Sequence, residues 1–357
     1  MKISGIIDMG GITMKIAFFD TKPYDRSSFE KYGNEYDITF KFFETKLSAD
    51  TVDLARGYDG VCVFVNDTVN AVVIDRLSQM NVKMLALRCA GFNNVDMKHA
   101  FGRLHVFRVP AYSPYAVAEH TMALLLTSIR RIHKAYIRTR DFNFSLSGLT
   151  GFDLHGKTVG VIGTGRIGRV FVDICRGFGM NILAFDKNPA EEIDNGDTIR
   201  YTDLDELFAK SDIISLHCPL TEETHHIIDE RVIEKCKKGV VIINTSRGAL
   251  VDTQALLKGI KSRKIGAACL DVYEEESDLF FEDNSGHILD DDILARLISM
   301  PNVIVTSHQA FLTEEALENI AATTVKNINT FMKTGQCPNE LCYRSGNAGD
   351  CKDKKCF

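Results

Sequence analysis

Three side chains that lie far apart in the sequence have the chemistry to act on a small keto acid. Arg247 stands in the polar stretch Asn-Thr-Ser-Arg-Gly after an apolar run, and its guanidinium could bind a carboxylate in bidentate fashion. His308 follows another apolar run and could donate or accept a proton near neutral pH. Glu276 could hold the orientation of that imidazole. Together with a nicotinamide cofactor, these groups fit hydride transfer to the C2 atom of a 2-keto acid.

Each of these residues, taken alone, also fits a purely structural role. A histidine after a strand is often structural, and Glu276 ends the acidic run 274–276, which could be a solvated loop. We interpret His217, His225 and His226 as structural or loop residues, because no H-E-x-x-H motif or compact Cys/His set surrounds them. We therefore expect no metal site.

A glycine-rich segment predicts a dinucleotide site. Residues 158–168 read Thr-Val-Gly-Val-Ile-Gly-Thr-Gly-Arg-Ile-Gly. The run 158–162 predicts a buried parallel strand, and residues 169–178 predict a helix. The G-x-G-x-x-G spacing places glycines at Gly163, Gly165 and Gly168. They would allow a tight turn, close approach of a pyrophosphate, and close packing of helix on strand, while the helix N-terminus would attract the phosphates.

An acidic residue after the next predicted strand, 181–185, strengthens this interpretation. Asp186 comes 23 positions after Gly163, where a carboxylate can bind the ribose hydroxyls of a dinucleotide. It favours NAD over NADP because it would repel a 2′-phosphate, although Lys187 beside it weakens that preference. The alternative is an ordinary strand–helix turn whose glycines serve packing alone.

Composition is that of a soluble globular protein of two domains. The chain has 357 residues, of which 25% are charged and 45% hydrophobic. A net charge of −6 gives no support to a nucleic-acid or anionic-membrane partner. We find no apolar stretch of 18 residues and no signal-peptide pattern, so we expect a cytoplasmic protein. Six of the ten cysteines lie in apolar or motif segments, which suits a reducing compartment: Cys62, Cys89, Cys175, Cys218, Cys236 and Cys269.

Strands and helices are predicted to alternate along the chain, which indicates parallel sheets in an α/β fold. Before the glycine-rich segment, the predicted strands are 14–19, 38–43, 61–66, 84–88 and 106–109, and the predicted helices begin at 25 and 71. After it, the predicted strands are 213–216, 240–243, 266–270 and 303–306. Polar residues recur just beyond the carboxyl ends of these strands, the edge where open α/β sheets bind ligands.

Two further segments have alternative interpretations. The loop 88–96 could bind a substrate carboxylate through the backbone N–H groups of Ala90 and Gly91, or it could be a plain loop between strand and helix. Residues 114–137 predict one long helix, apolar nearly all round from 116 to 126. Such a helix could form a subunit interface or lie in the core of one domain, because both bury its faces.

These motifs together resemble those of the D-2-hydroxyacid dehydrogenase family, in particular its fermentative D-lactate dehydrogenases. The resemblance covers residues 14 to about 341, and its segments are 163–168, 217–221, 244–252, 270–276 and 307–313. It implies two Rossmann-like domains, one flavodoxin-like, with a deep cleft between them. The substrate-binding domain would comprise 1–112 and 312–357, and the NAD-binding domain 113–311.

The resemblance also implies a role for individual residues. Arg247 would bind the substrate, Glu276 would pair with the catalytic His308, and the backbone at Ala90 and Gly91 would bind the carboxylate. Residues expected to line the substrate pocket are Tyr112 and Phe311. Residues expected to bind NAD are Gly163, Gly165, Arg166, Ile167, Gly168, Asp186, Cys218, Pro219, Thr224, Thr245 and Asp271, the last near the carboxamide.

The implied activity is the reversible, NADH-dependent reduction of pyruvate to D-lactate by a cytoplasmic homodimer or homotetramer. One alternative is a larger 2-keto acid, because Phe92 and Tyr112 could shape the pocket. Another is an NAD(H)-sensing interaction protein like the corepressors of this fold, which keep the same catalytic residues, although long flanking interaction segments are lacking here. A formate dehydrogenase is disfavoured, since formate oxidation needs no Glu–His proton relay.

Both ends of the chain depart from the family pattern. Residues 1–13 are an extension, expected to be poorly ordered. The end of the chain carries Cys337, Cys342, Cys351 and Cys356 in loose C-x4-C spacing. Zinc ligands are usually spaced more tightly, so we expect a disordered tail from Cys342 onward rather than a metal site.

Overall fold

The computed structural model describes residues 14–189, 199–276 and 279–343. The chain forms two compact units: a first unit of 1–113 with 313–357, and a second unit of 114–312. These limits lie one residue from the boundaries expected from the sequence. The N-terminal extension and residues 344–357 of the expected tail lie outside the described residues.

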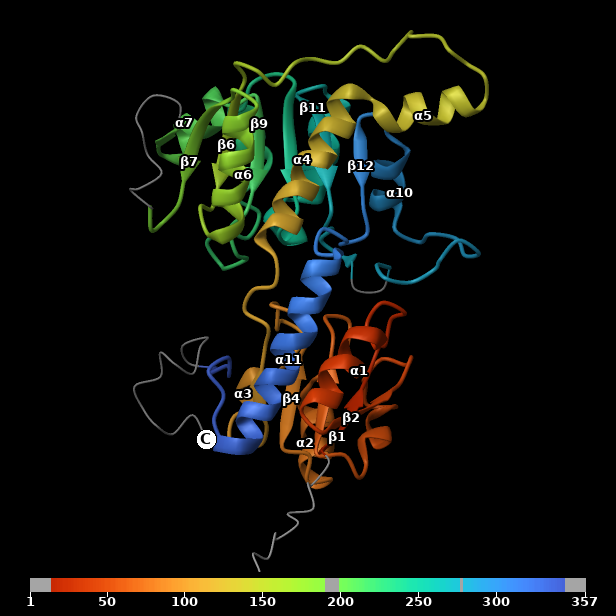
Figure 1. The fold of residues 1–357 in the computed structure, drawn as a ribbon. Coiled ribbons are helices and arrows are strands. Elements are labelled where there is room, and N and C mark those ends of the chain that lie inside the picture. The colour runs from red at the N-terminus through yellow and green to blue at the C-terminus, as the bar shows by residue number, and fades with distance from the viewer. Residues whose placement is uncertain (1–13, 190–198, 277–278, 344–357) are drawn as a thin grey trace, which may run out of the picture. The chain divides into compact units, whose positions relative to one another are not determined.

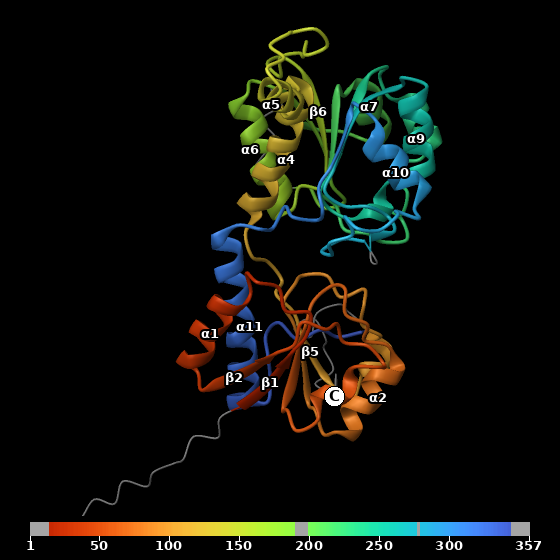
Figure 2. The ribbon, with the colours of Figure 1, turned by 90° about the vertical axis from the view of Figure 1, so that its right-hand side faces the viewer.

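The first unit is built on a five-stranded parallel sheet in the order β2-β1-β3-β4-β5. Its strands are β1 (Met14–Phe18), β2 (Ile38–Phe42), β3 (Gly60–Val63), β4 (Met84–Leu87) and β5 (His105–Phe107). Its helices are α1 (Arg26–Glu35), α2 (Ala71–Gln79), α3 (Met97–Ala100) and α11 (Glu314–Thr334), with a 3₁₀ turn at Val52–Ala55. Helices α1 and α11 cover one face and α2 the other (Figure 2), in the flavodoxin-like strand order.

The second unit has a seven-stranded parallel sheet in the order β12-β11-β10-β9-β6-β7-β8. Its strands are β6 (Thr158–Ile162), β7 (Asn181–Phe185), β8 (Ile199–Tyr201), β9 (Ile213–Leu216), β10 (Val240–Asn244), β11 (Ile265–Leu270) and β12 (Val303–Val305). The strand order reverses between β6 and β9, which is the switch point where Rossmann folds bind dinucleotides. The prediction of parallel α/β sheets in two Rossmann-like domains is confirmed.

Helices cover both faces of the second sheet (Figures 1 and 2). They are α4 (Pro114–Arg130), α6 (Arg166–Gly177), α7 (Leu204–Lys210), α8 (Glu230–Lys235), α9 (Thr253–Lys261) and α10 (Asp292–Ser299), with a 3₁₀ turn at Gly248–Leu250. Helix α5 (Ile132–Arg140) has no buried residue and extends away from the sheet (Figure 1). The strands between them are buried on both sides, as in β10, where all five residues are buried. Such runs read as continuous apolar sequence because neither face meets water.

The long helix expected over 114–137 is instead two helices. Arg131 adopts a left-handed conformation, with φ 54° and ψ 31°, and separates α4 from α5. Because a non-glycine residue in this conformation cannot continue a right-handed helix, the chain changes direction there. Helix α4 packs on α6 and β11 as a core helix of the second unit. Its expected role in a subunit interface stays a prediction.

Smaller differences concern the limits of the elements. Helix α6 begins at Arg166, three residues before the expected start, because Gly165 serves as its N-cap. The three-residue strand β8 was not expected. Cys337 and Cys342 are buried, so the expectation of a disordered tail is wrong for Cys342. Among the described residues, no helix is both long and apolar enough to cross a membrane.

Candidate active site

Glu276 and His308 form a hydrogen-bonded pair in the second unit. His308 Nδ1 lies 2.9 Å from Glu276 Oε1, and the two side chains are 20% and 23% exposed. Glu276 Oε2 accepts a hydrogen bond from the backbone N–H of Tyr273 at 3.0 Å, which fixes the carboxylate. Because a carboxylate accepts the proton on Nδ1, the other ring nitrogen, Nε2, is the one that can exchange a proton with a substrate.

The backbone around His308 is held by the buried carboxylate of Asp271. Asp271 Oδ1 accepts from Gln309 N at 2.9 Å, Oδ2 accepts from Ala310 N at 2.8 Å, and the carbonyl accepts from His308 N at 2.7 Å. His308 has φ 54°, a conformation that is costly for a non-glycine residue. These bonds hold it in place. Asp271 was expected at the carboxamide of NAD, and that contact stays a prediction.

Helix α4 contributes a further polar contact to Asp271 that sequence reasoning missed. His120 Nε2 lies 3.3 Å from Asp271 Oδ1 and 3.2 Å from Thr306 Oγ1, and Thr306 Oγ1 donates to Asp271 Oδ1 at 2.5 Å. Burial raises the pKa of Asp271, but the hydrogen bonds from His120, Thr306 and Ala310 outweigh it and lower the pKa overall. The available signal was a histidine inside a mostly apolar helix.

Arg247 stands at the carboxyl end of β10, next to the strand that leads to Glu276. Asn244 Nδ2 donates to the Arg247 carbonyl at 2.8 Å, and Arg247 Nη1 donates to the Ser246 carbonyl at 2.6 Å. A Cβ atom at Gly248 would overlap the Tyr273 carbonyl. Only glycine therefore lets the loop of Arg247 pack directly against the loop of Glu276.

Neighbouring strands bring the three predicted catalytic residues to one edge. Strands β10, β11 and β12 pair in that order and run parallel, so their carboxyl ends meet at the same edge of the sheet. Arg247 follows β10, Glu276 follows β11, and His308 follows β12. Glu276 and His308 are in hydrogen-bond contact; Arg247 is on the adjacent loop.

The glycine-rich turn has the shape that a pyrophosphate requires. Gly163 has φ +97°, and a Cβ there would lie 2.6 Å from Cys218 N. A Cβ at Gly168 would overlap the Gly163 carbonyl, whereas a Cβ at Gly165 would enter open space. Open space in front of Gly165, the N-cap of α6, is where the free N–H groups of Arg166 and Ile167 can meet phosphates.

The Asp186 carboxylate is hydrogen-bonded to this turn. Its Oδ2 accepts from Thr164 N at 2.7 Å, and its Oδ1 accepts from Asn188 N at 2.9 Å. Thr164 belongs to the glycine-rich segment, so the carboxylate is positioned directly by the turn it is expected to serve. The residues present thus fit an adenosine dinucleotide.

The remaining predicted cofactor residues lie on the loops after β9 and β10. Cys218 is buried, and burial raises the pKa of its thiol to about 11, so the thiol is uncharged at neutral pH. Thr224 Oγ1 donates to the Pro219 carbonyl at 2.7 Å and shapes that loop. Thr245 Oγ1 lies 2.8 Å from Thr121 Oγ1 of α4, another polar helix residue that sequence reasoning missed.

The other predicted substrate residues divide between the two units. Ala90, Gly91 and Tyr112 belong to the first unit, and Phe311, which is buried, belongs to the second. Arg108 Nη1 donates to the Ala90 carbonyl at 3.2 Å. Cys89 Sγ donates to the Gly91 carbonyl at 3.3 Å. These hydrogen bonds hold the loop in place. The binding of a carboxylate by its N–H groups stays a prediction.

Just before this loop, Arg88 forms a buried charge cluster that the sequence did not indicate. Its guanidinium donates to the Asp20 carbonyl at 2.6 Å and lies 3.5 Å from Asp25 Oδ2. Asp67, also buried, accepts from Phe64 N at 2.6 Å. Burial raises the pKa of Asp67 to about 6, although Arg88 and the backbone hydrogen bonds lower it. This cluster anchors the end of β4, from which Ala90 and Gly91 project.

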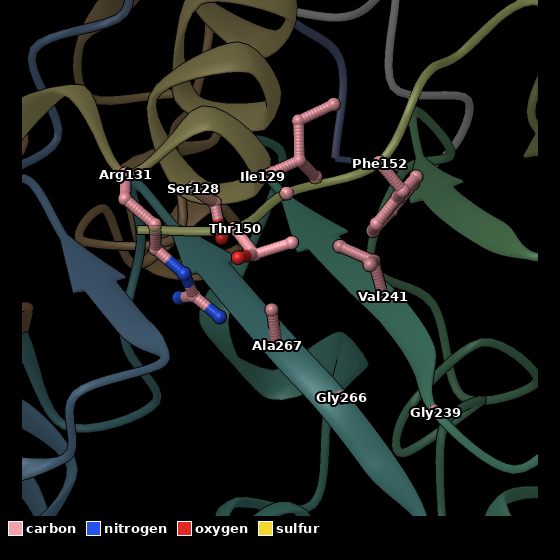
Figure 3. Close-up of a pocket in the computed structure, with 10 residues that line it drawn as sticks. Ser128, Ile129, Arg131, Thr150, Phe152, Gly239, Val241, Gly266 and Ala267 are labelled. Atoms are coloured by element: carbon pink, nitrogen blue, oxygen red, sulfur yellow. The ribbon is translucent and has the colours of Figure 1, made fainter. Parts of the chain in front are cut away.

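A pocket of about 160 Å³ in the second unit lies away from these residues (Figure 3). It is lined by the end of α4, by residues 150–152, and by the first residues of β10 and β11. Since the candidate catalytic residues follow the carboxyl ends of the same strands, the pocket is at the opposite edge of the sheet. It is not part of the candidate active site.

The sequence profile of the D-isomer specific 2-hydroxyacid dehydrogenase NAD-binding domain matches residues 122–310. The chain belongs to the D-isomer specific 2-hydroxyacid dehydrogenase family. It is therefore an NAD-dependent oxidoreductase, and the sequence-based assignment to this family is confirmed.

Relatives of this dehydrogenase match it over nearly their whole length. It is 50% identical over 331 residues to the D-lactate dehydrogenase of Escherichia coli, covering 92% of this chain and 100% of the relative. The solved apo-structure of D-lactate dehydrogenase from that organism superposes with a TM-score of 0.83 at 47% identity, with 92% and 100% coverage. It is also 41% identical over 333 residues to an aromatic 2-oxoacid reductase of Clostridium sporogenes, with 92% and 99% coverage.

Proposed function

We propose that this dehydrogenase interconverts pyruvate and D-lactate with NAD(H), in the cytoplasm and as a homo-oligomer. The observation that carries the reaction type is the hydrogen bond between His308 Nδ1 and Glu276 Oε1, 2.9 Å long, at the sheet edge where the loop of Arg247 also lies. The similarity to D-lactate dehydrogenase at 50% identity supports the choice of substrate.

In this proposal each catalytic side chain has one task. Arg247 binds the carboxylate of pyruvate through its guanidinium fork and orients the keto group. His308 Nε2 donates a proton to the oxygen at C2 during reduction and removes it during oxidation. Glu276 holds the imidazole through Nδ1 and stabilises its protonated form. Bound NADH supplies the hydride from its nicotinamide C4 atom.

The supporting residues are assigned in the same way. The N–H groups of Ala90 and Gly91 bind the substrate carboxylate, and Tyr112 and Phe311 line the substrate pocket. Residues proposed to hold NAD are Gly163, Gly165, Arg166, Ile167, Gly168, Asp186, Cys218, Pro219, Thr224, Thr245 and Asp271. Asp186 is proposed to bind ribose hydroxyls, and the hydrogen bond from Thr164 N, which orients its carboxylate, supports this role.

A larger 2-keto acid is the second candidate substrate. The 41% identity to an aromatic 2-oxoacid reductase favours it, and Phe92, in the loop of Ala90 and Gly91, packs against Arg108 with the guanidinium 5.5 Å from the ring centroid. An aromatic side chain held at that loop could narrow or complete a pocket for either substrate.

One assay separates these candidates. NADH oxidation is followed with pyruvate, phenylpyruvate, oxaloacetate and glyoxylate, and the product configuration is determined by chiral chromatography. We expect the highest kcat/KM with pyruvate and D-lactate as the product. A preference for phenylpyruvate would favour the aromatic alternative, L-lactate would contradict the family assignment of stereochemistry, and NADH binding without turnover would favour the NAD(H)-sensing alternative.

A further inference from the structure

Three side chains able to bind a metal converge on the surface of the second unit. They are His225, His226 and Glu274, and one ligand atom of each lies within 4.8 Å of the other two. His226 Nε2 is 2.6 Å from Glu274 Oε1, and the two imidazole rings stack with centroids 3.9 Å apart. We propose that this cluster binds a divalent transition-metal ion such as Zn²⁺. The sequence could not indicate it, because Glu274 lies 48 residues from His226.

Two imidazoles and one carboxylate form a donor set that suits zinc and its neighbours in the transition series. Ligand atoms about 2.0–2.2 Å from a tetrahedral ion lie roughly 3.3–3.6 Å from one another. The His226–Glu274 pair, 2.6 Å apart, would separate slightly to admit the ion, and His225 would rotate toward it. His225 is the exposed member, and its imidazole can make that rotation without disturbing the core. The fourth position would hold water.

The carboxylate is already oriented for this task. Glu274 Oε2 accepts from Thr253 Oγ1 at 2.7 Å, which leaves Oε1 facing His226. Burial raises the pKa of Glu274, but the hydrogen bonds from His226 and Thr253 prevail and lower it. A carboxylate that is ionised and fixed by a second residue is the usual arrangement around a bound metal. The ion would replace the proton between Nε2 and Oε1.

A bound ion would connect the loops that carry the candidate catalytic residues. The N–H of His226 donates to the Ala249 carbonyl at 2.9 Å, two residues after Arg247. Glu274 lies two residues before Glu276, and a Cβ at Gly248 would lie 2.5 Å from the backbone nitrogen of Glu274. Zinc bound by His226 and Glu274 would therefore cross-link the loop after β9, which is bonded to the loop of Arg247, to the loop of Glu276. This link would stabilise the second unit.

The test is zinc binding to the metal-free, full-length protein, measured by isothermal titration calorimetry and thermal unfolding with ZnCl₂ as the only ligand. We expect one zinc per chain in the wild type and a rise in Tm of about 5 °C or more at a hundredfold excess over Kd. At the same zinc concentration, His225→Asn should weaken binding at least tenfold and reduce the rise in Tm by half or more, and Glu274→Gln should do the same. His287→Asn removes another exposed histidine of this unit and should bind zinc like the wild type.

The cysteines near the C-terminus require their own control. Cys351→Ser with Cys356→Ser should leave zinc binding unchanged, and the Co²⁺-loaded wild type should show no thiolate charge-transfer absorption. The proposal is overturned if the wild type binds no stoichiometric zinc, if binding survives His225→Asn, or if the cysteine double variant loses it. Because zinc affinity and Tm are read without substrate, this outcome is independent of the proposed reaction.

Discussion

The second unit contains two histidine–glutamate pairs that have similar geometry but different surroundings. His308 meets Glu276 at 2.9 Å, and His226 meets Glu274 at 2.6 Å. Both histidines have a left-handed backbone, with φ 54° and 53°, and the two glutamates are two residues apart. The side chains of His308 and His226 are 20% and 32% exposed. Pairing alone therefore does not identify a catalytic residue.

The neighbours of each pair make the difference. Beside His308 lies the ring of Phe281, with centroids 5.7 Å apart, and the backbone of His308 is bonded to buried Asp271. Beside His226 lies a second imidazole, that of His225. An apolar neighbour and an anchored backbone suit transfer of a single proton, whereas a second nitrogen donor suits a shared cation. Substitutions in the two pairs should separate these roles.

The largest expected effect is on turnover by His308→Ala. Loss of a general acid–base should lower kcat by about two to four decades, measured as steady-state NADH oxidation with pyruvate. His287→Ala, an exposed histidine away from both pairs, is the control. Near-normal turnover by His308→Ala would remove this imidazole from the mechanism.

Arg247→Lys should have the next largest effect. A point charge cannot replace the bidentate guanidinium fork, so kcat/KM for pyruvate should fall by about 10- to 100-fold, as expected for the loss of one charge-assisted hydrogen bond. The variant is measured over a range of pyruvate concentrations so that KM and kcat are resolved. Unchanged values of both would contradict the role of this residue in binding the carboxylate.

The Asp186→Ala variant tests the preference for NAD over NADP. Removing the carboxylate removes the repulsion of a 2′-phosphate, so the ratio of kcat/KM for NADH over NADPH should fall. The expected fall is about fivefold or more, because two unit charges about 4 Å apart in water interact by about 1 kcal/mol. The measurement compares both cofactors at saturating pyruvate. A wild type that already uses NADPH equally well would contradict the preference for NAD.

Glu274→Gln should act on stability in the absence of metal. The variant weakens charge-assisted hydrogen bonds to His226 and Thr253, which should cost about 1–3 kcal/mol of the free energy of unfolding, measured by urea denaturation in EDTA. If instead it lowered kcat as strongly as His308→Ala, the distinction between the two pairs would fail.

His217 is a third histidine at the sheet edge formed by the carboxyl ends of the strands. Its Nε2 lies 2.9 Å from the hydroxyl oxygen of Ser215. Burial lowers its pKa to about 4. In the unfolded chain, the His217 imidazole takes up a proton near pH 6.5. The contribution of neutral His217 to the free energy of unfolding is therefore fully present above about pH 6.5 and is lost as the pH falls from about 6.5 to 4. The loss should reach at most about 3 kcal/mol.

Urea unfolding at pH 7.5 and pH 5 measures this loss. The difference between the two conditions should be smaller in His217→Gln than in the wild type. An equal difference in both proteins would show that another group carries the acid sensitivity.

Local patterns were sufficient to predict much of the fold and the chemistry of the site. Strand, glycines and helix around Gly163 are consecutive in the chain, so their apolar pattern and turn residues specify them directly. Family resemblance supplied the pairing of Glu276 with His308, which are 32 residues apart. The roles assigned to these residues await the kinetic tests.

What the sequence did not predict depends on contacts between distant segments. The break at Arg131 has no glycine or proline to mark it. The contacts of His120 with Asp271 and Thr306 depend on how α4 packs against β11 and β12. Nothing in the sequence around His120, Asp271 or Thr306 marks them as partners, because only tertiary packing brings these side chains together.

The contact of Gly248 with the Tyr273 carbonyl has a consequence for altering this enzyme's substrate range. A saturation library that randomises position 248 would recover misfolded chains in place of new specificities, because any side chain separates two neighbouring loops at once. Design should keep that glycine and diversify residues such as Phe92 and Tyr112, which are proposed to shape the substrate pocket.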